Sequence, residues 1–310
     1  MVEINELNKN AMGGTELMMY GLKERIDPAL YDKFQIICSR VRGLDIYKKK
    51  ILWLHDLALD PEAAHLKDEV SRNRFDKFVF TSNWQYQQYR DYLGMPFNSK
   101  SVVIENAIEP IKMEKKEFNG TINLIYHTTP HRGLEILVPV FEELCKIRDD
   151  IVLDVYSSFK IYGWAERDKQ YEDLFERCKA HPKINYHGTV SNQEVKEALK
   201  KAHIFAYPSI WQETSCISVI EAMSAGCMVV HPNYGALPDT TGGLTTMYQW
   251  DSNINIHANK FAGILNNSID VVKQEPAQNY LQFVKTYADL RFNWDKIAGQ
   301  WTGVMQSLTQ

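Results

Sequence analysis

Short apolar runs alternate with amphipathic segments along most of this chain, and this alternation constrains the fold more than any other feature. Apolar runs with the length of strands lie at residues 34–38, 50–54, 77–81, 101–104, 122–126, 151–156, 184–187, 203–207 and 228–231. Segments with helical periodicity lie at residues 15–26, 83–93, 132–147, 166–180, 192–201 and 218–225. Strands that alternate with helices pair in parallel, because each crossover helix returns the chain to the same edge of the sheet. The sequence therefore predicts an α/β protein that has parallel sheets with helices on both faces, and the regular second part predicts a doubly wound sheet.

The length of the chain predicts two domains. Its 310 residues, of which 45% are hydrophobic, exceed one ordinary domain of about 100–200 residues. The polar stretch at residues 114–120 ends in Asn-Gly and has the composition of a linker. We expect domains at residues 1–112 and 113–289. Residues 290–310, in an aromatic-rich helical segment, are expected to dock back on the first domain, although ordinary core packing explains the aromatic residues equally well.

The charge of the chain argues against a nucleic-acid partner. The formal net charge is −4, whereas a protein that binds a nucleic-acid backbone usually carries a basic face. Two basic runs, at residues 48–50 and 112–116, are typical of a solvated surface. No apolar run reaches the roughly 20 residues of a membrane span, and the acidic N-terminus is unlike a signal peptide. We expect a cytoplasmic protein, with a peripheral membrane contact through a basic surface left open.

The cysteines argue against two kinds of stabilising site. The five cysteines are widely separated, and no two of them form a Cys-x2-Cys pair. This spacing disfavours both a zinc cluster and a disulfide framework, and it fits a reducing compartment. We therefore expect no metal site and no resident cofactor.

A candidate phosphate-binding turn follows the strand expected at residues 122–126. Thr129 has the side chain of a helix N-cap, and Pro130 suits the first turn of a helix. The free N–H groups of such a turn attract an anion such as a diphosphate, and His131 and Arg132 add positive charge there. On this segment alone, a plain connection between strand and helix with a solvated arginine is the stronger interpretation.

Two glutamates eight residues apart, Glu213 and Glu221, mark a second candidate site. The strand expected at residues 203–207 ends just before Pro208, so Glu213 lies at the carboxyl edge of the sheet, where open α/β sheets bind ligands. Glu213 can hold sugar hydroxyls, Glu221 can accept hydrogen bonds from a ribose diol, and N–H groups near Cys216 can meet phosphates. Taken alone, a surface Glu213 and a Glu221 that complements a helix dipole is slightly favoured.

Together the two segments resemble the family-4 glycosyltransferases. Arg-Gly-Leu-Glu at residues 132–135 resembles the family's Lys-Gly-Leu-Asp, and Glu-Ala-Met-Ser-Ala-Gly at residues 221–226 resembles its Glu-Ala-Met-Ala-Xaa-Gly. Further matching motifs lie at residues 184–188, 206–209 and 235–238, so the resemblance covers about residues 120–245. Weaker likenesses precede them, in a Gly-Gly turn at residues 12–16 and a His-containing loop at residues 54–56.

The resemblance implies the GT-B fold, in which two Rossmann-like domains with parallel sheets face a cleft, here with the N-terminal domain reduced in size. It implies a retaining, metal-independent transfer of a sugar from a nucleotide-diphosphate sugar, with UDP or GDP as the nucleotide, to a glycan or small-molecule acceptor, as in polysaccharide biosynthesis. The catalytic positions that it implies are Glu213, His55 and Arg132. The donor-binding positions that it implies are Gly14, His127, Arg132, Gly188, Val190, Glu213, Thr214, Ser215, Cys216, Ile217 and Glu221.

Three departures from the family pattern modify this expectation. The first concerns charge: His127 stands where the family has an arginine, so a side chain that ordinarily titrates near pH 6.5 replaces a permanent cation, while Arg132 replaces the family's lysine and can bind phosphate in a bidentate manner. The second, Ser215-Cys216 in place of Phe-Gly, is mild. The third is the short first domain, which leaves the acceptor site open or completed by another copy in a homodimer.

Three alternatives to a retaining transferase stay open. A nucleotide-sugar epimerase can use the same scaffold, and the short first domain gives this hypothesis some weight. A catalytically impaired nucleotide-binding or assembly subunit is the second, and both His127 and the short domain favour it. Glycosylation of modified DNA bases is the third, and the net charge of −4 disfavours it.

Overall fold

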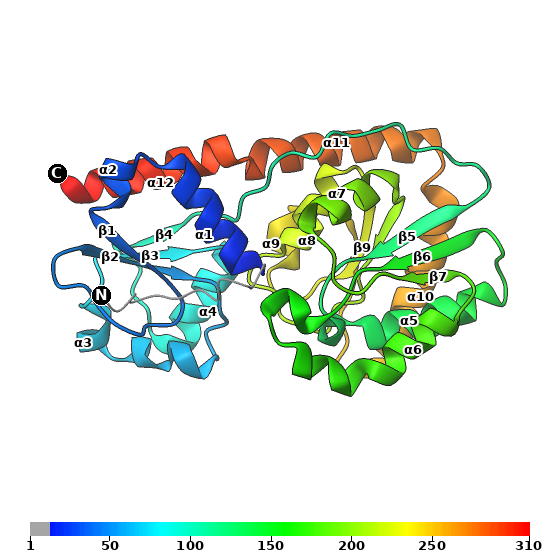
Figure 1. Ribbon diagram of the computed structural model, residues 1–310, viewed down its shortest axis with the longest axis horizontal. Coiled ribbons are helices and arrows are strands. Elements are labelled where there is room, and N and C mark those ends of the chain that lie inside the picture. The colour runs from blue at the N-terminus through cyan, green and yellow to red at the C-terminus, as the bar shows by residue number, and fades with distance from the viewer. Residues whose placement is uncertain (1–12) are drawn as a thin grey trace. The chain divides into compact units, whose positions relative to one another are not determined.

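A computed structural model describes residues 13–310, so Met12 of the Gly-Gly turn lies outside the described residues. The described chain forms two compact units, one of residues 13–107 with 292–310 and one of residues 108–291. The C-terminal helix thus belongs to the same unit as the N-terminal third of the chain. Figure 1 shows the chain coloured from blue at the N-terminus to red at the C-terminus. Within residues 13–310, no helix combines the length and the apolar character needed to span a bilayer.

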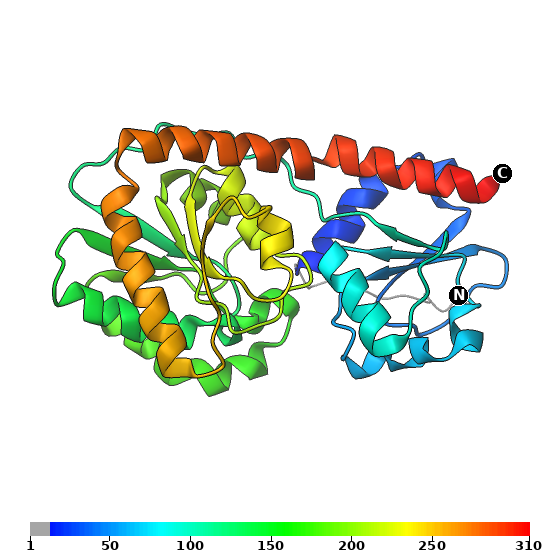
Figure 2. The same cartoon turned by 180° about the vertical axis from the view of Figure 1, so that it is seen from behind.

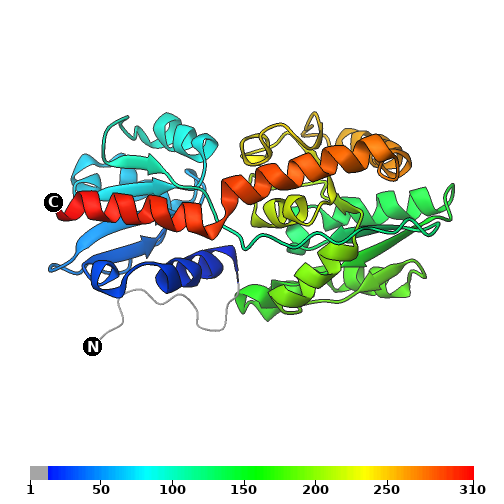
Figure 3. The same cartoon turned by 90° about the horizontal axis from the view of Figure 1, so that it is seen from above.

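The first unit is built on a parallel four-stranded sheet in the order β1-β2-β3-β4. Its strands are β1 (Phe34–Cys38), β2 (Lys49–Leu54), β3 (Lys77–Phe80) and β4 (Ser101–Val103). Its helices are α1 (Gly14–Arg25), α2 (Pro28–Tyr31), α3 (Glu69–Arg72), α4 (Asn83–Leu93) and α12 (Trp294–Thr309), with a 3-10 helix η1 (Pro61–Lys67). Helices α1 and α12 lie over one face of the sheet, and α3 and α4 lie on the other (Figures 1 and 3).

Helix α12 is an integral part of the core of the first unit. Trp301 is fully buried and packs edge-on against Trp53 of β2, with ring centroids 4.7 Å apart. At the start of α12, Trp294 lies so close to α1 that a Cβ on Gly21 would meet its ring at 2.2 Å. The C-terminal segment expected to be helical is helical. It is two helices, because Asn293 caps α12 by accepting a hydrogen bond from the N–H of Lys296 at 2.9 Å.

The second unit is built on a parallel six-stranded sheet in the order β10-β9-β8-β5-β6-β7. Its strands are β5 (Ile122–Tyr126), β6 (Ile151–Val155), β7 (Ile184–Tyr186), β8 (Ile204–Ala206), β9 (Met228–Pro232) and β10 (Thr246–Tyr248). The strand order reverses between β5 and β8, which pair directly. This reversal is the topological switch point at whose carboxyl edge doubly wound sheets bind ligands.

Helices cover both faces of the second sheet (Figures 1 and 2). They are α5 (Leu134–Cys145), α6 (Glu172–Ala180), α7 (Asn192–Lys201), α8 (Ile217–Ser224), α9 (Leu237–Thr241), α10 (Ile254–Val271) and α11 (Glu275–Phe292). Helices α5, α6 and α10 pack on one face, while α7, α8 and α9 pack on the other. The predicted parallel α/β architecture is confirmed in both sheets, and the reversed strand order of the second sheet is the predicted doubly wound arrangement.

One local prediction in this unit is wrong in part, and two elements were not predicted. The helix expected at residues 166–180 is a 3-10 helix, η4 (Ala165–Tyr171), followed by the α-helix α6. Helix α10 and strand β10 were not expected at all. Phe261 and Leu265 of α10 are buried, and the helix contacts α5 and β9, so tertiary packing contributes to its stability.

Candidate active site

The turn after β5 is tightened by a glycine that no other residue can replace without strain. This turn consists of a 3-10 helix, η2 (Pro130–Arg132), and Gly133, whose φ is +129°. A Cβ at Gly133 would lie 2.3 Å from the carbonyl oxygen of Pro208, just after β8. Thr129 lies at the N-cap position of this 3-10 helix and Pro130 begins the helix, as expected, but the Thr129 side chain forms no capping bond, and the α-helix α5 begins at Leu134. The close approach brings Arg132 to the loop that carries Glu213.

Arg132 and Glu213 form a buried ion pair at this point. A guanidinium Nη1–H of Arg132 donates to Oε1 of Glu213, and the hydroxyl of Tyr207 donates to the same oxygen. Glu213 is only 4% exposed. Although burial alone would lower the pKa of Arg132, the Glu213 carboxylate raises it well above its usual range. Burial, reinforced by Glu213, likewise raises the pKa of Tyr207, so Tyr207 remains a hydrogen-bond donor.

The loop after β9 contacts the backbone of Glu213 and fixes its position. Gly235 has a φ of +59°, and a Cβ there would lie 2.7 Å from the backbone nitrogen of Glu213. The next residue, Ala236, donates its N–H to the carbonyl oxygen of Glu213 at 2.8 Å. The Gly-Ala-Leu-Pro motif at residues 235–238 thus holds the backbone of Glu213 in place, and with it the position of the carboxylate.

Aromatic rings surround the ion pair. The guanidinium of Arg132 lies 6.0 Å from the ring of Trp211, which is 41% exposed. His131 stacks on Phe159 at 5.1 Å and meets Trp211 edge-on at 4.9 Å. Burial and the nearby Arg132 lower the pKa of His131 to about 4, so His131 is neutral at physiological pH. Sequence reasoning assigned no role to Trp211 or Tyr207, and their only signal was their place beside Pro208 and Glu213.

His127 differs from the expectation that it titrates near pH 6.5. Its ring is 8% exposed and lies 4.5 Å from the ring of Phe205, and burial lowers its pKa to about 3. Its carbonyl oxygen accepts a hydrogen bond from Ser218 of α8 at 3.3 Å. Among the described residues, Nε2 of His127 and Oγ1 of Thr129 are buried without a hydrogen-bond partner. His127 is therefore a neutral, buried polar group.

Glu221 lies in the second turn of α8 and is 5% exposed. Its Oε1 accepts a hydrogen bond from Nδ2 of Asn192 at 3.3 Å, and burial raises its pKa. Asn192 is the first residue of α7, whose start is fixed by a capping box between Ser191 and Glu194. The capped end of α7 thus positions the partner of Glu221.

The other predicted positions divide between the two units. Cys216 is the N-cap of α8 and has no side-chain capping bond, while Ile217 begins that helix, and Thr214 and Ser215 lead into it. Gly188, with a φ of +65°, and Val190 follow β7.

In the first unit, Gly14 begins α1, and His55 follows β2. The N–H of His55 donates to Oγ of Ser39 at 2.7 Å, its ring lies 4.7 Å from Trp53, and burial lowers its pKa to about 3.

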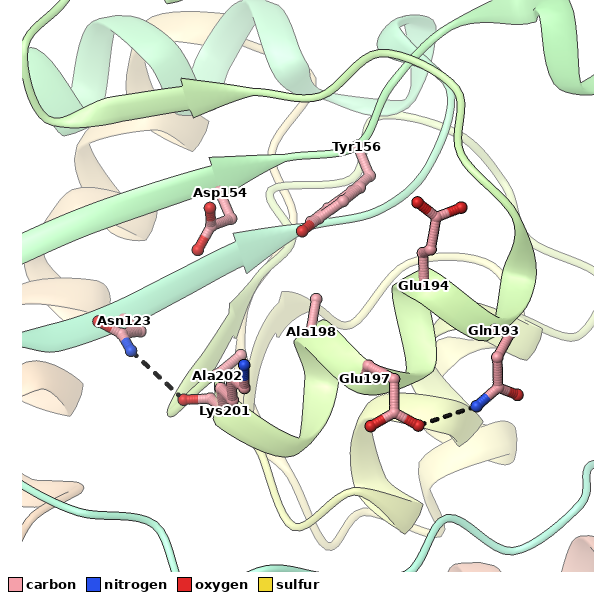
Figure 4. Close-up of a pocket in the computed structure, with 9 residues that line it drawn as sticks. All are labelled: Asn123, Asp154, Tyr156, Gln193, Glu194, Glu197, Ala198, Lys201 and Ala202. Atoms are coloured by element: carbon pink, nitrogen blue, oxygen red, sulfur yellow. Dashed lines mark hydrogen bonds between the residues drawn. The ribbon is translucent and has the colours of Figure 1, made fainter.

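A cavity of about 400 Å³ lies apart from these residues, between α7 and the polar side of β5 and β6 (Figure 4). It is lined by Asn123, Asp154, Tyr156, Gln193, Glu194, Glu197, Ala198, Lys201 and Ala202. The Asp154 carboxylate already accepts hydrogen bonds from His187 at 2.8 Å and Asn185 at 3.2 Å. In residues 13–310, no three His, Cys, Asp or Glu side chains gather as they would around a metal ion.

Comparison with known proteins gives the class of this chain. Residues 110–268, half of the chain, match the family described as glycosyl transferases group 1, so the chain belongs to this family. A phosphatidylinositol N-acetylglucosaminyltransferase subunit from Homo sapiens is 27% identical over 141 residues, which cover 44% of this chain and 28% of the human protein. Its counterpart from Arabidopsis thaliana is 25% identical over 146 residues, 46% of this chain and 31% of that protein. The match thus spans less than a third of the length of these relatives.

Solved structures give the fold. A glycosyltransferase from Rickettsia africae ESF-5 superposes with a TM-score of 0.72 at 15% identity, covering 100% of this chain and 85% of that chain. The Anabaena protein HepE, solved in complex with UDP and glucose, gives a TM-score of 0.66 at 15% identity, covering 84% of this chain and 72% of that chain. The fold is GT-B, as predicted.

Proposed function

We propose that this group 1 glycosyltransferase is a retaining enzyme that moves a sugar from a nucleotide-diphosphate sugar to a hydroxyl of a glycan or another acceptor. The observation that carries the proposal is the buried pair of Arg132 and Glu213, with Tyr207 on the same carboxylate oxygen, at the carboxyl edge of the sheet beside its switch point. A permanent cation beside a fixed carboxylate suits a substrate that presents a diphosphate next to sugar hydroxyls.

Arg132 is the main cation for the leaving diphosphate in this proposal. Its Nη1 is engaged with Glu213, while its Nε is buried without a hydrogen-bond partner among the described residues. The Arg132 side chain is 20% exposed, so it can donate to a phosphate oxygen without releasing Glu213. Nε2 of His127 and Oγ1 of Thr129 are further polar atoms without a hydrogen-bond partner among the described residues. Because His127 is neutral, it would contribute a hydrogen bond to the substrate rather than a full charge.

Glu213 orients the transferred sugar, and Glu221 accepts hydrogen bonds from the ribose. The backbone N–H groups near Ser215, Cys216 and Ile217, where α8 begins, lie where they can meet the sugar or its phosphates. Gly188 and Val190, after β7, form the nucleobase side of the site. UDP or GDP is the nucleotide, and the UDP complex of the Anabaena protein supports UDP.

The transfer itself needs no metal in this proposal. The bond between the anomeric carbon and the diphosphate oxygen breaks, and its electron pair leaves with the diphosphate, where Arg132 meets the charge. The acceptor oxygen forms the new bond from the same face, and its proton passes to the departing phosphate. His55 and Gly14, in the first unit, serve the acceptor and the sugar. A homodimer that completes the short first unit remains part of the proposal.

The variant Glu213→Gln tests the assignment. We expect at least a hundredfold loss of sugar transfer with little change in the affinity for UDP, because the amide keeps the shape of the side chain but not its charge. Glu135→Gln, an exposed glutamate in the first turn of α5, is the matched control and should stay active. A fully active Glu213→Gln enzyme would contradict the proposal, provided that thermal unfolding shows both variants folded.

A nucleotide-binding subunit with impaired catalysis is the second candidate. The neutral His127 favours it, and so does the name of the human relative, which calls that protein a subunit. Incubation with UDP-sugars and no acceptor separates the candidates. A transferase releases UDP slowly by hydrolysis, an epimerase yields an isomeric donor, and an impaired subunit binds UDP in calorimetry without turning the donor over.

A further inference from the structure

The amino edge of the first sheet forms one continuous surface. We use this name for the residues that lead into its four strands, namely 31–33, 45–50, 74–77 and 97–101. In a parallel sheet these segments share an edge, and hydrogen bonds join them here. The N–H of Lys49 donates to the carbonyl of Lys33 at 3.2 Å, and Nζ of Lys77 donates to the carbonyl of Ser99 at 2.6 Å. In Figure 1 the loop between β1 and β2 projects beyond the sheet at this edge.

Three large apolar side chains project from the amino edge into solvent. Ile46 is 79% exposed, Tyr47 is 92% exposed and Phe97 is 82% exposed. The same loop buries its other apolar side chains, since Val41 and Leu44 pack against the core of this unit. This loop therefore packs two of its apolar side chains against the core, whereas the side chains of Ile46 and Tyr47 are exposed to solvent.

The loop that carries Ile46 and Tyr47 is held in position by hydrogen bonds. Gln35 of β1 donates its side-chain amide to the carbonyl of Gly43 at 3.0 Å and accepts the N–H of Asp45 at 2.8 Å. Asp45 in turn accepts the N–H of Tyr47 at 2.8 Å. The exposure of the two apolar side chains is thus a defined feature of a fixed loop.

The amino edge is basic in a protein that is acidic overall. This edge contains seven basic residues and only three carboxylates, although the net charge of the whole chain is −4. Two of the carboxylates are occupied by backbone N–H groups: Asp45 binds Tyr47, and Asp76 binds Lys50 at 2.8 Å. The basic residues are Lys33, Lys48, Lys49, Lys50, Arg74, Lys77 and Lys100.

We propose that the amino edge docks on an anionic membrane surface. Aliphatic and aromatic side chains that stand among lysines have the chemistry of the bilayer interface, where rings enter the headgroup layer and ammonium groups meet lipid phosphates. This complementarity of charge, combined with apolar tips, selects a lipid surface over a nucleic acid, which would leave Ile46 and Phe97 without a partner. The carboxyl edge of the same sheet, where His55 follows β2, is the opposite edge and stays open in this arrangement.

Sedimentation of the full chain with vesicles tests the proposal. The vesicles contain phosphatidylcholine with about one-quarter phosphatidylserine, and vesicles of phosphatidylcholine alone are the reference. We expect binding to the anionic vesicles that weakens as salt rises, because added ions screen exposed lysines. The double variant Ile46→Ser, Tyr47→Ser should bind at least about tenfold more weakly. Ile147→Ser, which removes an equally exposed apolar side chain from the second unit, should bind as the wild type does.

A second pair of variants separates charge from apolar contact. Lys48→Glu combined with Lys49→Glu should weaken binding about tenfold or more, whereas Lys115→Glu, an exposed lysine of the second unit, should have little effect. Failure of the wild type to bind anionic vesicles at low salt overturns the proposal, and so does unchanged binding of both double variants. A concentration-dependent dimer that the Ile46→Ser, Tyr47→Ser variant abolishes, without vesicle binding, assigns the edge to a second copy and also overturns it.

Discussion

At the scale of single residues, the carboxylate of Glu213 is defined by what donates to it. Arg132 and Tyr207 share one of its oxygens, so the orientation of the carboxylate depends on both donors. Tyr207 reaches this position because it directly follows β8, six residues before Glu213. This geometry makes Tyr207 a positioning residue in the proposed transfer reaction.

We expect Tyr207→Phe to lower the turnover number about tenfold or more and to leave the affinity for UDP nearly unchanged. A hydrogen bond to a charged group contributes about 1.5–3 kcal/mol, and each 1.4 kcal/mol in the barrier is about tenfold in rate. Steady-state kinetics and calorimetry with UDP measure the two quantities. Tyr248→Phe, which removes a buried hydroxyl bonded to His257 at 3.1 Å, is the control for loss of a buried hydroxyl. Equal turnover in Tyr207→Phe and the wild type would contradict the positioning role.

Gly133 carries a second prediction at this scale. We expect Gly133→Ala to cost about 2–4 kcal/mol of unfolding free energy, because its φ is +129° and the new Cβ would meet the Pro208 carbonyl at 2.3 Å. Gly299→Ala is the contrasting control: this glycine lies inside α12 with open space around it, so alanine there should stabilise by about 0.5–1 kcal/mol. Urea unfolding of both variants measures the difference, and equal effects would contradict the steric argument.

The candidate site could be predicted from the sequence only in part. Glu213, Glu221 and Arg132 were found because they belong to short motifs with a recognisable spacing. Tyr207 and Trp211 were missed because nothing local distinguishes a ring that faces Glu213 from one that faces the core. The protonation state of His127 was mispredicted for a similar reason: its low pKa comes from burial against Phe205, which is a tertiary contact.

At the scale of elements, helix ends with a local chemical cause were the most predictable. Helix α7 begins where Ser191 caps it, and α4 begins after Ser82, which accepts the N–H of Gln85 at 3.0 Å. Elements whose limits depend on other parts of the chain were not predictable. The basic run at residues 112–116 was expected to be solvated, yet Lys116 is 7% exposed and donates to the carbonyls of Leu199 and Ala202 at the end of α7.

Lys285 of α11 makes a comparable set of contacts and supports a prediction about this element. Its Nζ donates to the carbonyls of Ile111 at 2.6 Å and Ser224 at 2.7 Å, and it pairs with Asp289 at 2.7 Å. Lys285→Met removes this donor from the two buried carbonyls and from Asp289, which still accepts from the Ser224 hydroxyl, so we expect a loss of about 3 kcal/mol in unfolding free energy. Lys273→Met, an exposed lysine, should change stability by less than about 0.5 kcal/mol. Denaturant titration compares them, and a tolerated Lys285→Met would show that the contacts contribute little.

At the scale of the whole molecule, the alternation of strands and helices was sufficient to predict parallel sheets in both units and a doubly wound sheet in the second. The strand order was not predictable, because it depends on which strands pair across the switch point. The assignment of α12 to the first unit rests on contacts such as Trp301 with Trp53, which join residues nearly 250 positions apart in the printed sequence. Periodicity identifies such a helix but does not identify its partner.

The buried histidines make the stability of the whole molecule depend on pH. His127 is 8% exposed and His231 is fully buried, and burial lowers their pKa values from 6.5 to about 3 and about 4. Below pH 6.5 the unfolded chain binds protons that the folded chain does not. The contribution of each histidine to stability is therefore fully present above pH 6.5 and is lost as pH falls toward the folded pKa. Glu221, whose pKa burial raises, has the opposite sign, so total stability alone does not isolate the histidines.

The variant His127→Leu separates the contribution of one buried histidine to the pH dependence of stability. Leucine keeps an apolar contact with Phe205 and removes the titrating group, so the loss of stability between pH 6.5 and 5 should be about 1.6 kcal/mol smaller in the variant than in the wild type. Urea unfolding at a series of pH values measures the difference between the two proteins. Parallel curves across this range would mean that His127 titrates equally in the folded and unfolded states. The neutral, buried hydrogen-bonding group that the proposed donor site requires at this position would then be excluded.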